Sequence, residues 1–458
     1  MFAPVVPVRN IKIVMGNLTH NNIVLALIIV EGRVLITQRY THVDQGGKWE
    51  FPGGKQELHE SSLHALQREC REELGITVTE AQPFMQFATV FDVWQVLAFE
   101  GHATACCAQD LRWVPLYDLR SYDFPEANQA LLDKIVPFWT QQWQSAFKKV
   151  DDLLVYLGLS RDDVLLVDDH SDFPLRVPLA FADRMEKGNP HDPLLMQVLP
   201  LMQERIQVPG FTTDPLGEKQ ANPLPGLLHK YHGRVLLTLS GACGIHCRYC
   251  FRRHFAYKDN NPGTKGWEPV FAYLAQHPDI NEVILSGGDP LTVDDERLES
   301  FIQRLAAIPS VRYLRFHTRM PVVLPARITP KLLSILAASR FRMTMVLHSN
   351  HANEWNEFLR LPMKQLSMSG VTLLNQAVLL KGVNDRLADQ VALSCRLYEY
   401  GVLPYYLHLL DKVAGASHFD LDQAQVLSLR QGMIEVLPGY LVPKFVYEAA
   451  GEKSKIPL

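Results

Sequence analysis

The sequence predicts an α/β protein in which a compact mixed α/β domain precedes a larger domain with an open, mainly parallel sheet. The first observation is length, because 458 residues are too many for one ordinary core and predict two or three domains. The second is a change of pattern near residue 140, where short strands give way to a regular alternation of strands and helices. The apolar content of 47% and the charged content of 21% fit a globular protein.

Charge, apolar runs and cysteines exclude several classes of protein. A net charge of −4 creates no field that would gather bulk nucleic acid or an anionic membrane. The longest apolar run, Ile23 to Val30, is too short to span a bilayer. The start MFAPVVPVRNIKIV lacks a charged segment followed by an apolar block, so we expect no signal peptide and a cytoplasmic location. Seven cysteines, an odd number, are then expected as free thiols.

The first half is predicted to consist mainly of short strands. They are NIVLALIIV, RVLITQR, MQFATVF, VWQVLAF and RWVPL. One helix is expected from Ser62 to Leu74 and another from about Glu126. We therefore expect a mixed α/β domain over residues 21–137, after an N-terminal extension of residues 1–20.

The second half is predicted to begin with a helical preface, residues 138–225, because TQQWQSAFKKVDDLLVYLGL has an amphipathic helical pattern. Over residues 226–458 six strands alternate with helices: RVLLTL, EVILSGG, VRYLRFHT, RMTMVLHS, VTLLNQAVLL and VLPYYLHLL. Such units imply parallel strands joined by right-handed crossovers. Six are too few for a closed eightfold barrel, so we expect an open partial (β/α)6 barrel with ligands at the carboxyl ends of its strands.

Three cysteines lie directly after the first of these strands. The stretch SGACGIHCRYCFRRHF contains Cys243, Cys247 and Cys250. A zinc site could recruit a nearby histidine, but structural zinc usually joins two separated ligand pairs. A cubane iron-sulfur cluster is normally held by four thiolates, so three leave one iron open. The CxxxCxxC spacing resembles the radical S-adenosylmethionine (SAM) enzymes, whose open iron chelates SAM, and we prefer a [4Fe-4S] cluster to zinc in a binding protein.

A glycine-rich turn ends the second strand. It is SGGDP, with Ser286, Gly287, Gly288 and Asp289. The radical SAM resemblance makes this turn the place where the amino group of SAM is held, and glycines expose backbone groups without side-chain obstruction. Taken alone, the turn could equally be an ordinary strand-to-helix connection.

The last residues, LVPKFVYEAAGEKSKIPL, suggest a second cofactor. With SGACGIHCRYCFRRHF, NQAVLLKGVND and LPYYLHLLDKV they resemble lysine 2,3-aminomutases from about Gln142 to Leu458. In that family the lysine of a K-[IT]-P-L element carries pyridoxal 5′-phosphate (PLP), and Lys455 fits this element whereas Lys453 does not. The resemblance implies that an electron from the cluster cleaves SAM to a 5′-deoxyadenosyl radical and that PLP stabilises the rearranging lysine.

The same resemblance assigns substrate and cofactor contacts. Arg252 pairs with the substrate carboxylate, for which a guanidinium is geometrically suited. Asp385 and Glu448 occupy the acidic positions that hold the ε-ammonium group of L-lysine. Lys230 and Arg234 fall where basic residues approach the PLP phosphate.

Two further stretches narrow the resemblance. FADRMEKGNPHDPLLMQVLP and GFTTDPLGEKQANPLPGLLHKY closely resemble the aminomutases that supply (R)-β-lysine for elongation factor P (EpmB type). Longer aminomutases carry further cysteines and a C-terminal extension for zinc, and this chain, which stops at Leu458, has neither. The implied partners are L-lysine, elongation factor P through its β-lysine ligase, and an electron donor such as flavodoxin.

The first half carries a second motif, GKQELHESSLHALQRECREELGI. It satisfies the fixed positions of the Nudix box: Gly54, Glu60, Arg68, Glu69, Glu72, Glu73, Gly75 and Ile76. Three glutamates on one helix face repel one another by roughly 0.2–0.5 kcal/mol per pair, and bound Mg²⁺ would reverse that sign. The resemblance implies a Nudix α/β/α sandwich in which Gly54 and the three glutamates surround Mg²⁺ and Glu69 is catalytic. A solvated acidic helix is the alternative.

The type of Nudix domain follows from neighbouring residues. WEFPGGKQE and DFPEANQALL resemble the MutT type, which releases pyrophosphate from oxidised purine nucleoside triphosphates such as 8-oxo-dGTP, and Asn128 matches its purine-contacting asparagine. Cys107 stands near the place of an acidic residue of that type. This departure motivates an alternative in which the domain is only a nucleotide-binding regulatory module. Because the two reactions share no metabolite, we expect a fusion of two enzymes without channelling.

Overall fold

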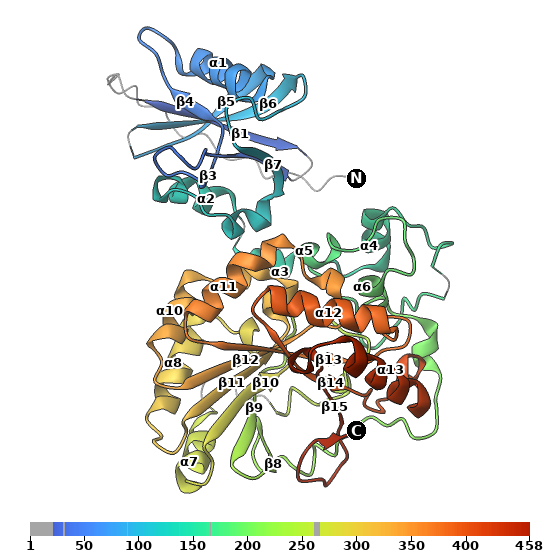
Figure 1. The fold of residues 1–458 in the computed structure, drawn as a ribbon. Helices are drawn as coiled ribbons and strands as arrows, with labels where there is room; N and C mark the ends of the chain where they lie inside the picture. The colour runs from blue at the N-terminus through green and yellow to red at the C-terminus, as the bar shows by residue number, and fades with distance from the viewer. Residues whose placement is uncertain (1–21, 31–32, 89, 137, 165, 261–265) are drawn as a thin grey trace. The chain divides into compact units, whose positions relative to one another are not determined.

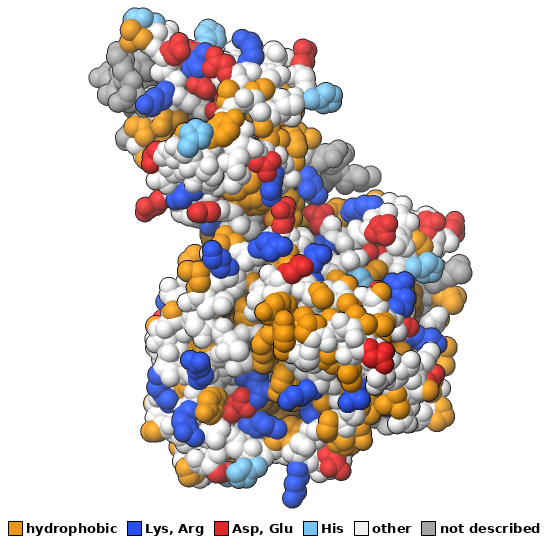
Figure 2. Space-filling model, in the orientation of Figure 1, with side chains coloured by type: hydrophobic (Ala, Val, Ile, Leu, Met, Phe, Trp, Pro, Cys, Tyr) orange, Lys and Arg blue, Asp and Glu red, His pale blue; other side chains and the backbone are white. Residues whose placement is uncertain are grey.

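The computed structural model describes residues 22–30, 33–88, 90–136, 138–164, 166–260 and 266–458, and the chain forms two compact units that divide between Val136 and Pro137 (Figure 1). The expected extension of residues 1–20 lies outside the described residues. None of the helices in the described ranges combines the length and apolar character that crossing a bilayer requires. On the face seen in Figure 2, acidic and basic side chains are interspersed.

The smaller unit is built on a mixed sheet with strand order β3-β2-β1-β6-β5, in which β4 also pairs with β1 and β7 with β2. Strands β1 and β6 run parallel, and the other pairs are antiparallel. Helices α1 and α2 lie on opposite sides of the sheet in Figure 1, which fits the expected α/β/α sandwich. The bounds are β1 (Ile23–Val30), β2 (Arg33–Gln38), β3 (Trp49–Glu50), β4 (Gly53–Lys55), α1 (Ser62–Leu74), β5 (Thr77–Phe87), β6 (Phe91–Glu100), β7 (Asp110–Pro115), η1 (Leu116–Ser121), η2 (Glu126–Asn128) and α2 (Gln129–Ile135).

Helix α1 has the predicted bounds because both of its ends are capped. The Ser61 hydroxyl accepts a hydrogen bond from the His64 backbone N–H at 3.2 Å. At the other end Gly75 adopts a left-handed conformation with φ of 69°, which favours glycine. The apolar side chains of α1 are buried in the core of this unit, so its acidic side chains are left at the surface.

One strand prediction of the smaller unit is wrong. The stretch MQFATVF is not a single strand, because its first residues end β5 and its last residue, Phe91, begins β6. Between them Ala88 has a positive φ of 51°, which an extended strand does not allow. Most of β5 was not predicted as a strand because it is largely exposed and rich in Glu and Gln, so it lacks an apolar alternation.

The predicted single helix at the start of the larger unit is also wrong, because it is two helices, α3 (Trp139–Gln144) and α4 (Val150–Leu157). Between them Phe147 and Val177 exchange two backbone hydrogen bonds, at 2.8 and 3.0 Å, in an isolated antiparallel bridge. Because the N–H and C=O groups of Phe147 are bonded to Val177, they are not available for the hydrogen bonds of a continuous helix. In the rest of the preface the described residues form short helices: α5 (Leu179–Ala182), α6 (Pro193–Met196) and η3 (Met202–Arg205).

All six predicted strands of the larger unit are present and parallel, as β9 to β14 in the sheet order β16-β15-β14-β13-β12-β11-β10-β9-β8. A further strand, β15, pairs parallel with β14, and β8 and β16 pair antiparallel at the two edges. The strand bounds are β8 (Leu227–Tyr231), β9 (Arg234–Ser240), β10 (Glu282–Gly287), β11 (Tyr313–Thr318), β12 (Arg342–His348), β13 (Thr372–Val378), β14 (Leu403–His408), β15 (Lys444–Tyr447) and β16 (Ile456–Pro457).

Helices follow the parallel strands and cover the outer side of the sheet in Figure 1. Their bounds are α7 (Glu268–Gln276), η4 (Pro290–Thr292), α8 (Asp295–Ala306), α9 (Met320–Val323), η5 (Pro325–Arg327), α10 (Pro330–Ala338), η6 (Ala352–Glu354), η7 (Glu357–Leu359), α11 (Arg360–Met368), α12 (Leu387–Glu399), η8 (Ser417–Phe419), α13 (Gln423–Val436) and η9 (Gly439–Leu441). A large apolar core runs between these helices and the strands. Because the parallel strands end on the same side, their last residues converge on one region.

Candidate active sites

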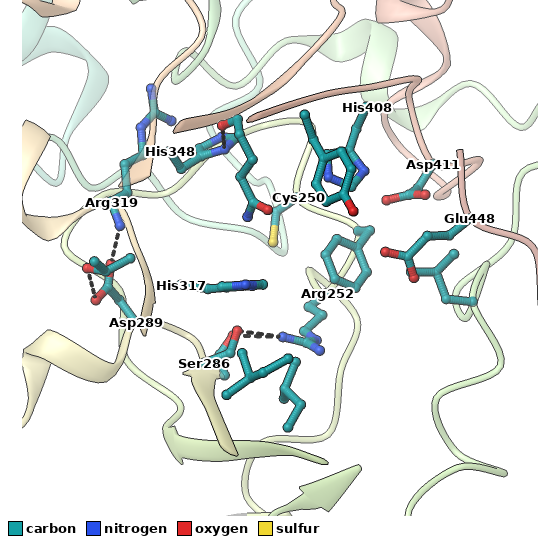
Figure 3. Close-up of a pocket in the computed structure, with 18 of the residues that line it drawn as sticks. Cys250, Arg252, Ser286, Asp289, His317, Arg319, His348, His408, Asp411 and Glu448 are labelled. Atoms are coloured by element: carbon teal, nitrogen blue, oxygen red, sulfur yellow. Dashed lines mark hydrogen bonds between the residues drawn. The ribbon is translucent and has the colours of Figure 1, made fainter. Parts of the chain in front are cut away.

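A cavity of about 350 Å³ lies at the carboxyl ends of the parallel strands (Figure 3). The predicted residues that line it are Cys243, Cys247, Cys250, Arg252, Ser286, Gly287, Gly288, Asp289, Lys230, Arg234, Glu448 and Lys455. Asp385 does not line it and lies half-buried in a turn after β13. The fold therefore brings together residues from β8, the loop after β9, β10 and the last residues of the chain.

The three cysteines form part of the cavity wall in the loop after β9. Burial, together with the nearby Cys247 thiol, raises the pKa of Cys250 to about 12. Burial also raises the pKa of Cys243, and the other two cysteines add to this. Three such thiolates are stable together only beside a strong positive charge, which a metal centre with soft sulfur ligands provides. Among the described residues no three His, Cys, Asp or Glu side chains converge as ligands of one metal ion.

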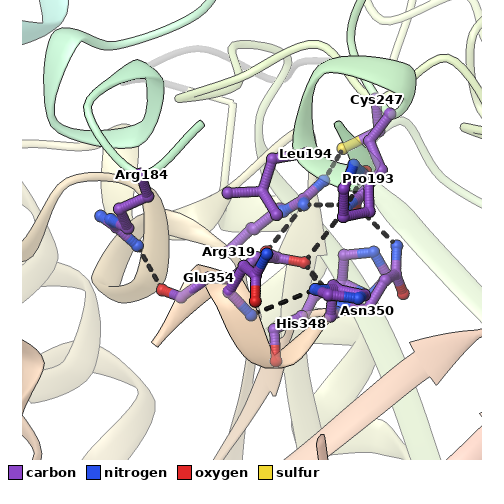
Figure 4. A network of polar contacts seen from close by, with 12 residues as sticks. Arg184, Pro193, Leu194, Cys247, Arg319, His348, Asn350 and Glu354 are labelled. Atoms are coloured by element: carbon purple, nitrogen blue, oxygen red, sulfur yellow. Dashed lines mark hydrogen bonds and ion pairs between the residues drawn. The ribbon is translucent and has the colours of Figure 1, made fainter. Parts of the chain in front are cut away.

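A buried arginine connects this loop to its surroundings (Figure 4). Arg319 Nη1 donates to Cys247 Sγ at 2.8 Å. Its Nη2 donates to Glu354 Oε2 at 2.9 Å and to Gln197 Oε1 at 2.7 Å. The Arg319 backbone N–H donates to Asp289 Oδ2 at 2.7 Å. One residue thus holds positive charge against a cysteine sulfur and joins that cysteine to the glycine-rich turn.

The glycine-rich turn lies directly against the cysteine loop. A Cβ at Gly288 would lie 2.3 Å from the Ala242 carbonyl oxygen, and Gly287 has a φ of 114°. Only glycine fits both requirements without moving the backbone. The Asp289 carboxylate is buried and accepts hydrogen bonds from Thr318 Oγ1 at 2.7 Å and from the Leu291 backbone N–H at 3.0 Å. Asp289 therefore fixes the shape of the turn.

Arg252 is held by an acidic residue that the sequence analysis missed. Its Nε and Nη2 donate to the two carboxylate oxygens of Glu218 at 2.8 and 2.7 Å. Its Nη1 faces Ser286 Oγ at 3.2 Å. Glu218 lies in the loop before β8, where no motif marks it.

Lys455 lines the same cavity. It forms an ion pair with Glu448, and its Nζ lies 3.4 Å from His408 Nε2. Glu448 also accepts a hydrogen bond from the Tyr231 hydroxyl at 3.2 Å. Lys230 Nζ lies 3.5 Å from a Glu218 carboxylate oxygen. Among the cations that surround this wall, Arg234 stacks over the Tyr231 ring at 4.7 Å.

Several lining residues were not predicted, although the position of the strand ends could have indicated them. Asp411 follows β14, His408 ends β14, His348 ends β12 and His317 lies near the end of β11. Burial and the nearby Glu448 carboxylate raise the pKa of Asp411 to about 7. The rule that ligands bind at carboxyl ends of parallel strands applies to all four.

The Nudix motif folds into a second, separate constellation in the smaller unit. A Cβ at Gly54 would lie 2.2 Å from Glu69 Oε1, so the glycine makes room for that carboxylate. Glu73 Oε2 accepts from the Gly53 backbone N–H at 2.9 Å, and burial raises the pKa of Glu73 to about 7. Glu72 is exposed, and acidic and basic side chains adjoin over α1 in Figure 2. These carboxylates beside backbone from β4 are a donor set suited to a hard divalent cation.

Arg68 neutralises part of this charge in the structure. Its guanidinium pairs with Glu60 at 3.0 Å, with Glu69 at 2.8 Å and with Glu72 at 3.4 Å. Asn128 is buried, and its Oδ1 has no hydrogen-bond partner. Cys107 is exposed, and its thiol donates to the Glu72 carbonyl oxygen at 3.6 Å.

Comparisons with known proteins match each half separately. Residues 24–134 match the family model described as NUDIX domain. A curated L-lysine 2,3-aminomutase from Escherichia coli (strain K12) is 47% identical over 322 residues, which is 70% of this chain and 94% of that protein. The protein of the same name from Haemophilus influenzae is 47% identical over 320 residues, 69% of this chain and 95% of that protein.

Solved structures were matched as well. One of them comes from a structural and functional study of MutT from Aliivibrio salmonicida and Vibrio cholerae, and its sequence is 41% identical to this chain over the matched residues. The match covers 25% of this chain and 95% of that chain, with a TM-score of 0.24.

Proposed function

Because the chain belongs to the lysine 2,3-aminomutase family, we propose that its larger unit converts L-α-lysine to (R)-β-lysine with a [4Fe-4S] cluster, SAM and PLP. The observation that carries this proposal is the single cavity lined by the cysteines, the glycine-rich turn and Lys455. Membership of an isomerase family leaves the alternative of a zinc-binding protein without support.

The residues that line the cavity suit a [4Fe-4S] cluster, SAM and PLP. Three half-buried thiols, of which Cys247 accepts a hydrogen bond from the Arg319 guanidinium, favour a cluster with an open iron, and the adjoining turn offers backbone groups to SAM. Lys455 is the amine for PLP, with Lys230 and Arg234 as phosphate partners. SAM supplies the radical and PLP supplies the conjugated system that lets nitrogen migrate.

Substrate lysine must be held at both ends. We assign its carboxylate to Arg252. The family resemblance assigns its ε-ammonium to Asp385 and Glu448, but only Glu448 lines the cavity, and Asp411 contributes a second carboxyl to the same wall. We therefore assign the ε-ammonium to Glu448 and Asp411.

The motifs around residues 181–231 support the elongation factor P type. On this proposal the β-lysine passes to the ligase that modifies elongation factor P in the cytoplasm, and a flavodoxin-like donor reduces the cluster. We retain the division into residues 1–20, 21–137, 138–225 and 226–458.

The decisive experiment is anaerobic reconstitution of the full chain with iron, sulfide, reductant, SAM and PLP. We expect L-lysine to give β-lysine, detected by chiral chromatography. Cys247→Ala and Lys455→Ala should abolish the product, whereas Lys453→Ala, an exposed lysine outside the motif, should not. Absence of product from protein that demonstrably carries both cluster and PLP would refute the proposal.

For the smaller unit we propose release of pyrophosphate from purine nucleoside triphosphates, including 8-oxo-dGTP, with Mg²⁺ held by Gly54, Glu69, Glu72 and Glu73. The fit of Glu69 against Gly54 and the unpartnered Asn128 Oδ1 support it. Pyrophosphate release should vanish in Glu69→Gln and persist in the exposed control Glu80→Gln. Binding of 8-oxo-dGTP without hydrolysis by the wild type would instead favour a regulatory module.

A further inference from the structure

One histidine in the wall of the larger cavity has an unused ring nitrogen. His317 lies near the carboxyl end of β11, and its buried Nε2 has no hydrogen-bond partner. The two other histidines of the wall are engaged. His348 contacts the Tyr249 hydroxyl at 2.8 Å and the Gln376 carbonyl at 3.0 Å, and His408 contacts Lys455. A buried nitrogen without a partner is costly unless a ligand satisfies it.

The surroundings of His317 define which kind of ligand. Burial, with Arg315, Lys455 and Arg252 nearby, lowers the pKa of His317 well below its usual value. The ring is therefore neutral at physiological pH and carries one N–H. The charged groups that act on the ring are cations, and each is paired with a carboxylate: Arg315 with Glu282, Lys455 with Glu448 and Arg252 with Glu218. A neutral N–H donor at this place suits an anionic ligand atom. In Figure 3 His317 lies between the side of the cavity that holds Asp289 and the side that holds Arg252.

Arg252 cannot satisfy a carboxylate alone in this arrangement. Glu218 occupies the two-pronged edge formed by its Nε and Nη2. Nη1 donates to Ser286 Oγ at 3.2 Å and to the Gly287 carbonyl oxygen at 3.5 Å, which leaves one N–H of Nη2 for a carboxylate. A carboxylate has two oxygens that accept hydrogen bonds, so a second donor is needed at this place.

We propose that His317 is a substrate-binding residue whose Nε2–H donates to the α-carboxylate of the amino acid that Arg252 holds. The inference rests on the proposed aminomutase function and adds a specificity determinant to it. A neutral donor completes the carboxylate site without adding to the positive charge of Arg252, Arg315 and Lys455. His317 thereby helps the cavity to distinguish an α-amino acid from an amine of the same length.

The test uses the full chain loaded with PLP alone, so that neither cluster nor turnover is needed. The dissociation constants of L-lysine and of 1,5-diaminopentane, which lacks only the carboxylate, are measured from the change in PLP absorbance. In His317→Leu the preference for L-lysine over the diamine should fall by about tenfold or more, as for loss of a hydrogen bond to a charged group. His317→Gln, which restores an N–H donor, should recover part of that preference.

A matched control is His229→Leu, because His229 pairs with the Tyr273 hydroxyl at 2.9 Å and does not line the cavity. Its preference should equal that of the wild type. An unchanged preference in His317→Leu would overturn the inference. Failure of His317→Leu to load PLP while His317→Gln loads it would also overturn the inference, because His317 would then bind PLP. Failure of the wild type to attach PLP to Lys455, tested by borohydride trapping and peptide mass spectrometry, would instead refute the proposed function.

Discussion

Asp411 gives the sharpest prediction about how the cavity receives a diamino acid. Burial and the nearby Glu448 carboxylate raise its pKa to about 7. Its ionised fraction is then about 0.1 at pH 6 and about 0.9 at pH 8, a ratio of about ten. If binding of the lysine ε-ammonium requires an ionised Asp411, the contribution of this ammonium group to the binding constant should rise about tenfold from pH 6 to pH 8.

The assay must separate this effect from the titration of the α-amino group. We therefore compare L-lysine with L-norleucine, which has the same chain without the ε-amino group, on PLP-loaded protein. The ratio of their dissociation constants should change in favour of lysine from pH 6 to pH 8, by up to about tenfold. In Asp411→Asn the ratio should be flat. Asp385→Asn is the matched control, because Asp385 does not line the cavity.

The pH dependence of protein stability provides an independent test of the raised pKa of Asp411. The folded-state pKa of Asp411 is raised, so the folded protein binds this proton more tightly than the unfolded chain does. The free energy of unfolding of the ligand-free protein should therefore fall as the pH rises through 7, by about 1.4 kcal/mol between pH 6 and pH 8. Asp411→Asn should remove this slope in denaturant unfolding of the larger unit. A flat affinity ratio in the wild type, or a pH-dependent one in Asp411→Asn, would refute the reasoning.

Three further predictions concern the cluster, the turn and the smaller unit. Arg319→Gln removes the positive charge beside Cys247 Sγ and should therefore lower the reduction potential of the reconstituted cluster. The potential is measured by redox titration with electron paramagnetic resonance, and an unchanged value would contradict the prediction. Gly288→Ala places a Cβ against the cysteine loop and should weaken SAM binding in calorimetry while PLP loading persists. Gly54→Ala should displace the Glu69 carboxylate and so reduce both Mg²⁺ affinity and pyrophosphate release, while β-lysine formation continues. Retained Mg²⁺ affinity would show that this carboxylate is not a ligand.

The sequence was informative where a function is contained in one continuous segment. The three cysteines follow a single strand, and the glutamates of α1 lie within one helix whose Ser61 and Gly75 caps are local signals. The six strand and helix units were predictable for the same reason, since each is a local pattern.

Features that depend on distant partners were not predictable. Asp411 and His317 become cavity residues only because separate parallel strands end side by side. Glu218 is 34 positions from Arg252 in the chain, and nothing in its neighbourhood marks the pairing. The amphipathic pattern of residues 140–159 predicted one helix, and only the pairing of Phe147 with the distant Val177 divides it.

The contact between Tyr231 and Glu448 joins the two margins of the open sheet. Tyr231 ends β8 at one margin, whereas Glu448 follows β15 and leads to β16 at the other. Backbone hydrogen bonds join each neighbouring pair of strands within the sheet. Between the ends of β8 and β15, in contrast, Tyr231 and Glu448 are joined by a side-chain hydrogen bond. Such a bond to a charged acceptor contributes only about 1.5–3 kcal/mol, so thermal fluctuation can part the margins there far more readily than it can separate paired strands. An opening at this place would lie beside Lys455, the residue proposed to carry PLP, because Glu448 contacts both Tyr231 and Lys455.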